Sequence, residues 1–352
     1  SCERLDLSCK FSASHLHAHA SRALIRLHIT AMAQIYSRAV HIATGIPYLM
    51  SADTIDPDLQ FDSPNPAFDI ARPEVLTSPV VFASPHSGCR YPEEFLKMSR
   101  LDNRAIRRSE DAFVDALFAE APNFGAPLLR AHFPRAYVDA NRESYELDQD
   151  MFAEPLPEWV NTKSSRVLAG LGTVAKVVAG GAEIYRNQLK FEEVHHRIKT
   201  FHRPYHEALD GLIQNALNKF GACLLIDCHS MPSSAMPHPS GAPSLPDIIL
   251  GDCHGISCSQ DIVQTTETTL RDLGLSVDRN KPYAGGFTTR HYANKYDNVQ
   301  TLQIEINRAL YMDEVLIRRH SGFDRTAERM RILISRLTDI NEKILPFRSA
   351  AE

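Results

Sequence analysis

The stretch LLIDCHSMPS, residues 224–233, joins an apolar run to two groups that do chemistry. Side chains alternate along a strand, so Asp227 and His229 would share one face while Cys228 points to the other. A carboxylate two residues from a histidine can orient its ring, or hold the second N–H of an imidazole that binds a metal. The alternative for this segment alone is a strand end whose polar groups simply meet water.

Two other strand-like segments carry similar groups. VVFASPHSG, residues 80–88, places His86 just after an apolar run, and VQTLQIEIN, residues 299–307, contains Glu305. Ligands of open α/β sheets bind beyond the carboxyl ends of the strands, and two histidines there suit a metal site. A carboxylate buried in a strand is costly unless it is paired or binds something. Glu305 therefore suits a general base acting on a metal-activated water, the alternative being a half-exposed strand with a polar outer face.

A fourth segment, FPRAYVDANRESYELD at residues 133–148, is rich in groups that bind anions. Arg135 and Arg142 stand at its start and end, where a guanidinium can grip a carboxylate through two parallel hydrogen bonds. Surface ion pairing with Glu143 or Glu146 is the alternative.

The elements that must position these groups form an alternating series of short apolar runs and helix-like segments. Such alternation favours a single α/β sandwich domain, residues 53–352, on a largely parallel or mixed sheet. A proline-rich stretch, 56–73, predicts a linker or surface arm, and Pro204 predicts a break in the longest helix. The expected strands are 79–84, 126–131, 135–140, 222–227, 246–251 and 299–306, and the expected helices are 109–121, 183–220, 260–273 and 324–345.

Composition excludes several classes of protein. A net charge of -5 over 352 residues gives no support for nucleic-acid binding, and no window approaches the roughly 18 apolar residues of a membrane span. Seven cysteines without any CxxC pair argue against a zinc ribbon and against a disulfide framework, so we expect reduced thiols in a cytoplasm. Residues 7–52 contain no acidic residue, as in a transit peptide, but we favour a disordered or non-native extension for residues 1–52.

Six segments in order resemble the N-formylglutamate amidohydrolase (N-formylglutamate deformylase) family: SPHSGCRYP, RRSEDAFVDALF, FPRAYVDANRE, DCHSMPS, NKPYAGGF and LQIEINRALYMDE. The resemblance runs from about Pro79 to the C-terminal helix. It implies a three-layer αβα sandwich with a mixed, mostly parallel sheet, similar to zinc carboxypeptidases and aspartoacylase-like hydrolases. Members of the family split N-formyl-L-glutamate into formate and glutamate in histidine degradation.

The resemblance assigns the metal ligands and the base. His86 and His229 would be two ligands, Asp111 the third with Glu110 as the alternative, and Glu305 the general base. First-turn acids also favour a helix dipole without any metal. A compact HxxE pair is lacking, since Cys89 stands three residues after His86. The expected cofactor is Zn²⁺, with Co²⁺ or Mn²⁺ as other divalent cations that suit such ligands.

The resemblance also implies which residues meet a small-molecule substrate. Arg142, with Asn141, sits where carboxypeptidase-like enzymes hold a carboxylate, and it could stabilise the developing oxyanion. Arg135 would hold the second carboxylate of glutamate. In YAGGFTTRHY, Gly286 permits close backbone approach to a ligand and Arg290 could face the pocket.

Three alternatives remain open at this point. The chain could act on another N-acyl amino acid or on a peptide C-terminus, or it could bind a ligand without catalysis.

His202 and His206 lie four residues apart, a spacing that helical zinc sites use. No glutamate follows His202 and Pro204 separates the pair, so a structural role is favoured for both.

Overall fold

The computed structural model describes residues 66–233 and 245–340. The extension expected at residues 1–52 and the end of the last expected helix lie outside this part of the chain. None of the helices described there is both long enough and apolar enough to cross a bilayer.

A seven-stranded sheet forms the centre of the described chain, in the order β1-β3-β2-β4-β7-β5-β6. The pairs β2–β3, β2–β4, β4–β7 and β5–β6 are parallel, whereas β1–β3 and β5–β7 are antiparallel. The expected class, an α/β fold on a mixed and mostly parallel sheet, is confirmed. The strands are β1 (Phe68–Ala71), β2 (Val80–Ser84), β3 (Leu128–Ala131), β4 (Cys223–Met231), β5 (Ile248–Gly251), β6 (Val277–Arg279) and β7 (Val299–Asn307), with a separate β8 (Met312–Asp313) and β9 (Arg318–Arg319) pair.

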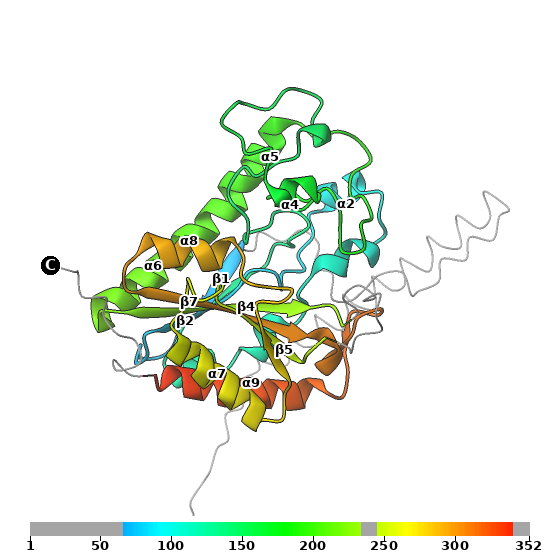
Figure 1. Ribbon diagram of the computed structural model, residues 1–352. Coiled ribbons are helices and arrows are strands. Elements are labelled where there is room, and N and C mark those ends of the chain that lie inside the picture. Colours follow the sequence, from blue (N-terminus) through cyan, green and yellow to red (C-terminus); the bar gives the residue numbers. More distant parts are fainter. Residues whose placement is uncertain (1–65, 234–244, 341–352) are drawn as a thin grey trace, which may run out of the picture. The chain divides into compact units, whose positions relative to one another are not determined.

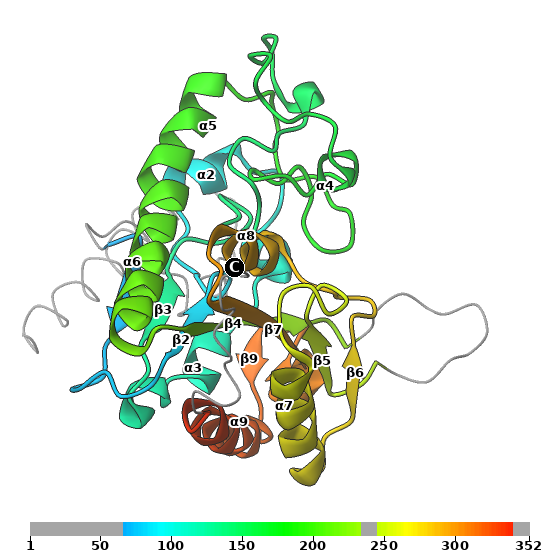
Figure 2. The same ribbon diagram turned by 60° about the vertical axis from the view of Figure 1, so that its left-hand side comes forward.

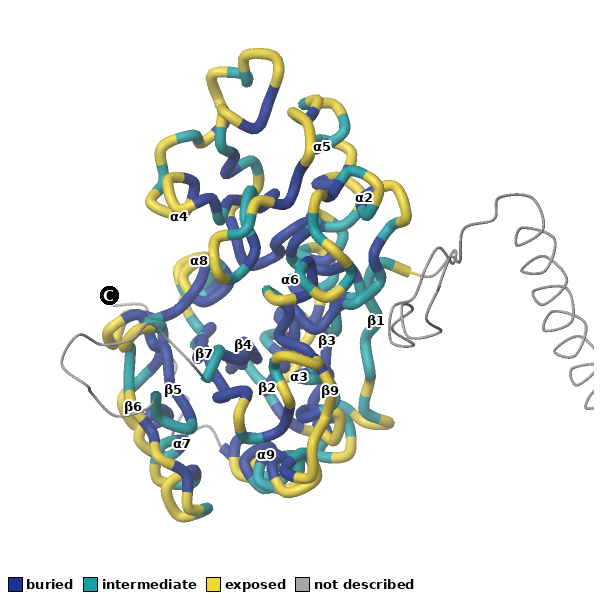
Figure 3. The backbone as a smooth tube through the Cα atoms, turned by 90° about the vertical axis from the view of Figure 1, so that its right-hand side faces the viewer, coloured by how far each residue is buried: buried dark blue, intermediate teal, exposed yellow. Residues whose placement is uncertain are grey.

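Helices cover both faces of the sheet, so the fold has three layers (Figure 1). On one face Cys228, Leu302 and Ile304 join a core with α3 (Val114–Leu117), α7 (Gln260–Asp272) and α9 (Phe323–Thr338). On the other face Val81 and Leu225 pack with α6 (Arg203–Phe220) and α8 (Phe287–Lys295). Figure 3 shows the buried backbone concentrated in the strands between these layers.

A third hydrophobic cluster draws on residues between Tyr91 and Ile198. It gathers α2 (Glu93–Met98) and α5 (Phe191–Arg197) with the loops near α4 (Ser165–Leu168). Beyond α5 the chain passes through a π-helical turn, Ile198–His202, and continues directly into α6. These three helical segments run on as one rod in Figure 2.

Three expected elements differ from those observed. Residues 135–140 form turns in place of a strand, because Tyr137 and Val138 both donate their N–H to the Pro134 carbonyl. The helix expected at 109–121 is broken: Ala105–Ser109 is a 3-10 turn, and α3 starts only after Phe113, which has a φ of 67°. The end of the proline-rich stretch 56–73, expected as a linker or a surface arm, contains the strand β1, which pairs with β3 at the edge of the sheet.

Candidate active site

The parallel pairing of β2, β4 and β7 brings the groups singled out in the sequence together near the carboxyl ends of these strands. His86 lies two residues beyond the end of β2, and His229 lies near the end of β4. In the parallel β4–β7 pair, His229 is the register partner of Glu305, and Asp227 is that of Gln303. Their neighbours Cys228 and Ile304 face the opposite core, as the two-residue period of a strand requires.

His86, Asp111 and His229 form a buried cluster that could hold a metal ion. Oδ2 of Asp111 lies 2.9 Å from Nδ1 of His229 and 3.3 Å from Nδ1 of His86. Two ligands at zinc-bond length and a tetrahedral angle are about 3.3 Å apart. One ligand atom from each of the three residues lies within 4.8 Å of the others, so together they could bind one small cation.

Each imidazole of this cluster is held from behind by a carboxylate. Nε2 of His86 lies 2.7 Å from Oδ1 of Asp139, and Nε2 of His229 lies 3.0 Å from Oδ2 of Asp227. A carboxylate on one ring nitrogen fixes the tautomer that presents the other nitrogen to a metal. The contact expected between Asp227 and His229 is thus confirmed, and His86 has an equivalent partner in Asp139.

The cluster contains a buried polar atom that lacks a hydrogen bond. His86 is only 1% exposed, so water cannot reach its ring, yet its Nδ1 makes no hydrogen bond. Buried polar groups are nearly always satisfied, so an exception calls for an explanation such as an ion. Two imidazole nitrogens and a carboxylate oxygen form a donor set that suits zinc, and cobalt or manganese to some degree. The residues present therefore fit the expected divalent cation.

Asp111 reaches the cluster through local backbone contacts. Its N–H donates to the His86 carbonyl at 3.0 Å, and its carbonyl accepts from the Ser87 hydroxyl at 3.1 Å. Burial alone would raise the pKa of Asp111, but the neighbouring imidazoles of His229 and His86 hold it well below its usual range. Arg308 also donates to Oδ1 of Asp111 at 3.0 Å. The carboxylate is therefore ionised and its second oxygen is anchored.

Glu110, the alternative third ligand, lies outside the cluster. Its carboxylate accepts from Arg107 at 2.9 Å and from the Tyr91 hydroxyl at 2.6 Å. Both partners are buried, and Tyr91 belongs to the third hydrophobic cluster, so these hydrogen bonds hold the carboxylate there. The geometry favours Asp111 over Glu110.

Glu305 stands beside the cluster as a buried acid. Gln303 donates to its Oε1 at 2.8 Å, and the residue is 6% exposed. Burial raises the pKa of Glu305 to about 7, with the charge of His229 opposing this shift and that of Asp111 reinforcing it. A carboxylate with a pKa near neutrality can both accept and return a proton.

Asn141 connects the cluster to helix α8. Its Nδ2 donates to Asp227 at 3.2 Å and lies 3.0 Å from Nε2 of His229, while its Oδ1 accepts the N–H of Thr288 at 2.8 Å. A side chain at Gly286 would collide with this amide. The close approach expected at Gly286 is therefore made, in this structure, by Asn141.

The three arginines expected to bind anions differ from one another in their contacts. Arg135 donates to Oδ2 of Asp139 at 2.8 Å. Arg142, only 8% exposed, donates to the backbone carbonyls of Leu171 and Asn141. Arg290 is exposed and, with Asn141 and Arg142, lines a cavity of about 1030 Å³. Asn141 lines this cavity and its Nδ2 lies 3.0 Å from Nε2 of His229, whereas His86, Asp111 and His229 do not line it.

Two site residues escaped the sequence reasoning. Asp139 belongs to the anion-binding segment 133–148, and the 53 residues that separate it from His86 leave no spacing that indicates their contact. Arg308 immediately follows the strand that carries Glu305, and nothing in its spacing indicates the contact with Asp111, which lies 197 residues away in the chain.

Comparison with known proteins places the chain in a family. Residues 78–312 match the family model described as N-formylglutamate amidohydrolase. N-formylglutamate deformylase of Pseudomonas aeruginosa is 28% identical over 67% of this chain and 83% of its own length. The corresponding protein of Pseudomonas putida is 26% identical over 67% and 82%. The crystal structure of N-formylglutamate amidohydrolase from Ralstonia eutropha JMP134 is 34% identical, with a TM-score of 0.73 over 79% of this chain and 98% of that one.

The geometry of the cluster predicts one tight divalent-cation site per chain. Replacing either His86 or His229 by alanine should lower the affinity for Zn²⁺ by at least about tenfold, because one of three ligands is lost. Equilibrium dialysis with metal analysis measures this. His132, which pairs with Asp69 at the edge strand, provides the control: His132→Ala should bind zinc like the wild type. Unchanged zinc affinity in both His86→Ala and His229→Ala would contradict the site.

Proposed function

Since the chain belongs to the N-formylglutamate amidohydrolase family, whose members are hydrolases acting on an amide, we propose that it hydrolyses N-formyl-L-glutamate to formate and L-glutamate. The observation that carries this proposal is the His86–Asp111–His229 cluster with Glu305 on the adjacent strand. Metal-assisted hydrolysis needs such a set: ligands for one cation and a base within reach of the same point.

We assign the cation site to His86, Asp111 and His229, with zinc as the expected ion. When bound there, the cation would supply a Lewis acid that polarises the formyl carbonyl and activates water. Asp139 and Asp227 keep the two rings oriented with Nδ1 toward the site. Arg308 fixes Asp111, so the carboxylate cannot rotate freely.

Glu305 is the group that moves the proton. Its carboxylate accepts a proton from the attacking water as the new C–O bond forms. It then delivers that proton to the amide nitrogen, which leaves as the amine of glutamate when the C–N bond breaks. An amide nitrogen is a poor leaving group unless it is protonated, and the raised pKa of Glu305 suits both transfers.

The carboxylates of the substrate need hydrogen-bond donors, and cationic donors hold them most strongly. We assign this role to Arg142 and Asn141, with Arg135 and Arg290 for the second carboxylate. Support comes from the cavity of about 1030 Å³, which Asn141, Arg142 and Arg290 line together. A guanidinium holds a carboxylate through two hydrogen bonds and so orients the amide as well as binding it.

The size of this cavity favours a second candidate function. Pockets of roughly 300–1,000 Å³ hold ligands of drug size, and this one is slightly larger than that range. Other N-acyl amino acids would therefore fit in this cavity, which adjoins the cluster through Asn141. Turnover of N-acetyl-L-glutamate exceeding that of N-formyl-L-glutamate would favour this second function.

The role of Glu305 predicts a sharp loss of activity on neutralisation. Glu305→Gln should lower formate release from N-formyl-L-glutamate by about 10²–10⁴-fold, because an amide cannot take up the proton. Chelation of the wild type should likewise abolish formate release, and added zinc should restore it. Formate assay and metal analysis on the same samples provide the measurement.

The matched control is Glu183→Gln, at an exposed carboxylate paired with Arg100, which should keep wild-type turnover. Zinc content in Glu305→Gln should equal that of the wild type. Loss of zinc from Glu305→Gln, or wild-type turnover by this variant, would show that Glu305 is not the base.

The raised pKa of Glu305 predicts how activity depends on pH. A base works in its deprotonated form, so kcat/KM should fall as the pH is lowered through the pKa of this carboxyl. Burial raises that pKa to about 7, and a bound cation would bring it down, so the midpoint should lie between about pH 5 and pH 7. A pH–rate profile of the zinc-loaded enzyme tests this, and a flat profile between about pH 5 and pH 8 would be inconsistent with it.

A further inference from the structure

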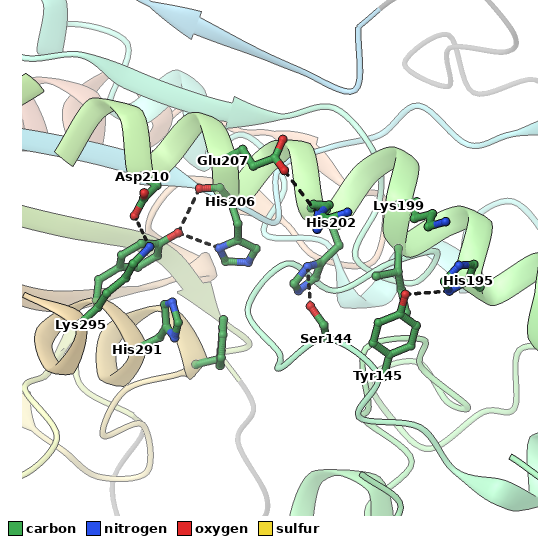
Figure 4. A pocket seen from close by; sticks show the side chains of 14 residues that line it. Ser144, Tyr145, His195, Lys199, His202, His206, Glu207, Asp210, His291 and Lys295 are labelled. Atoms are coloured by element: carbon green, nitrogen blue, oxygen red, sulfur yellow. Dashed lines mark hydrogen bonds and ion pairs between the residues drawn. The ribbon is translucent and has the colours of Figure 1, made fainter. Parts of the chain in front are cut away.

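Two histidines next to the site are not used by the chemistry above. His202 ends the π-helical turn and His206 lies one turn further along, in α6. Both line a cavity of about 530 Å³, and their ring centroids are 4.5 Å apart (Figure 4). π-helical turns occur frequently at functional sites, which suggests a functional role for this pair.

Both rings direct the same nitrogen at the backbone of one short segment. Nε2 of His206 donates to the carbonyl of Ala140 at 2.8 Å, and Nε2 of His202 donates to the carbonyl of Arg142 at 2.9 Å. A carbonyl only accepts, so each Nε2 must carry the hydrogen and each Nδ1 must be an acceptor. The Nδ1 atoms face hydroxyls that can donate to them, Ser144 at 3.3 Å for His202 and Tyr292 at 3.0 Å for His206. The Tyr292 hydroxyl also donates to the backbone carbonyl of His206 at 3.2 Å.

The surroundings keep these rings neutral. Burial, together with the neighbouring His202, lowers the pKa of His206 to about 3. Burial also lowers the pKa of His202, although its hydrogen bond with the Arg142 carbonyl opposes this. The hydrogen bonds to the two carbonyls therefore do not depend on a protonation change near neutral pH.

The two carbonyls flank Asn141, the residue that joins the cluster to α8. Its amide contacts Asp227 and Thr288, and Tyr292, the partner of His206, lies in the same helix as Thr288. Residues 140–142 are thus held on one side by α6 and on the other by Asp227 and α8. This segment contains no strand or helix of its own, so side-chain contacts must fix its position.

A second metal site is the competing account of two histidines four residues apart. It fails because each Nε2 is engaged by a carbonyl and each Nδ1 by a hydroxyl. In the part of the chain that the structure describes, His86, Asp111 and His229 form the one group with the spacing of metal ligands.

We propose that His202 and His206 are positioning residues, which clamp the backbone on both sides of Asn141 and thereby set Asn141 and Arg142 for the reaction. This inference rests on the proposed hydrolysis of N-formyl-L-glutamate. It assigns to the histidines no contact with substrate or cation; they act through the carbonyls of Ala140 and Arg142.

The test compares variants that keep or remove the donor N–H. His206→Leu and His202→Leu should each lower kcat/KM for N-formyl-L-glutamate by about 10- to 100-fold, as is usual for groups that orient site residues. His206→Gln and His202→Gln should recover most of the loss, because the glutamine amide nitrogen can donate to the same carbonyl. Zinc content should stay at the wild-type level in all four.

His195 offers a matched control. It lines the same cavity, but its Nδ1 pairs with the Tyr145 hydroxyl at 2.7 Å and its ring does not reach residues 140–142. His195→Leu should keep wild-type kcat/KM. A purely structural role for His202 and His206 would lower the melting temperature but leave kcat of the folded fraction unchanged, and glutamine would give no specific rescue.

A measurement on the wild type covers the case in which a leucine variant does not fold. In ¹⁵N-histidine spectra, both rings should remain neutral with the hydrogen on Nε2 from about pH 5 to pH 8. A neutral Nδ1–H tautomer, whose Nε2 has no hydrogen to donate, would overturn the clamp, as would wild-type kcat/KM in the folded leucine variants. Absence of formate release by the zinc-loaded wild type would instead refute the proposed function.

Discussion

The structure depends on the burial of four carboxylates at one edge of the sheet. Asp111, Asp139, Asp227 and Glu305 are each at most 6% exposed. Burying a charge is costly unless it is paired and hydrogen-bonded. Arg308 and Arg135 pair with Asp111 and Asp139, and Asp227 faces His229. A divalent cation among the imidazoles and Asp111 would meet the same requirement and supply the reaction's Lewis acid.

The pairing of the strands determines where these charged groups lie relative to one another. Parallel pairing of β2, β4 and β7 brings their carboxyl ends together, and the register places His229 beside Glu305. Behind these groups stands a second set of contacts: carboxylates hold the rings, and Asn141 ties Asp227 to α8. In the proposed reaction, precision at the reacting atoms would therefore depend on residues that do not touch the substrate.

Much of this arrangement could be predicted from local patterns. The two-residue period of LLIDCHS and LQIEIN predicted which side chains leave the core, and the pairing of β4 with β7 shows those side chains on one face. Resemblance to a family then pointed to Asp111, which an isolated SEDAF segment could not do. Acids in a first turn would have served a helix dipole equally well, and here the expected helix is broken.

Other features depend on contacts that a sequence pattern does not contain. Residues 135–140 look like a strand, but Pro134 and the Asp139 carboxylate, which accepts the Asn141 N–H at 2.8 Å, favour turns. His202 and His206 have an ambiguous spacing, and only the carbonyls of residues 60 and 66 positions earlier reveal what they hold. Arg308 meets Asp111 only after the whole sheet has formed.

The most direct test of the central claim is a crystal structure of the zinc-loaded protein with anomalous diffraction data at the zinc edge. We expect one strong peak, about 2.0–2.2 Å from Nδ1 of His86, Nδ1 of His229 and an oxygen of Asp111, with Glu305 beside the ion but not bound to it. A peak on other residues, or coordination of the ion by Glu110 in place of Asp111, would contradict the account.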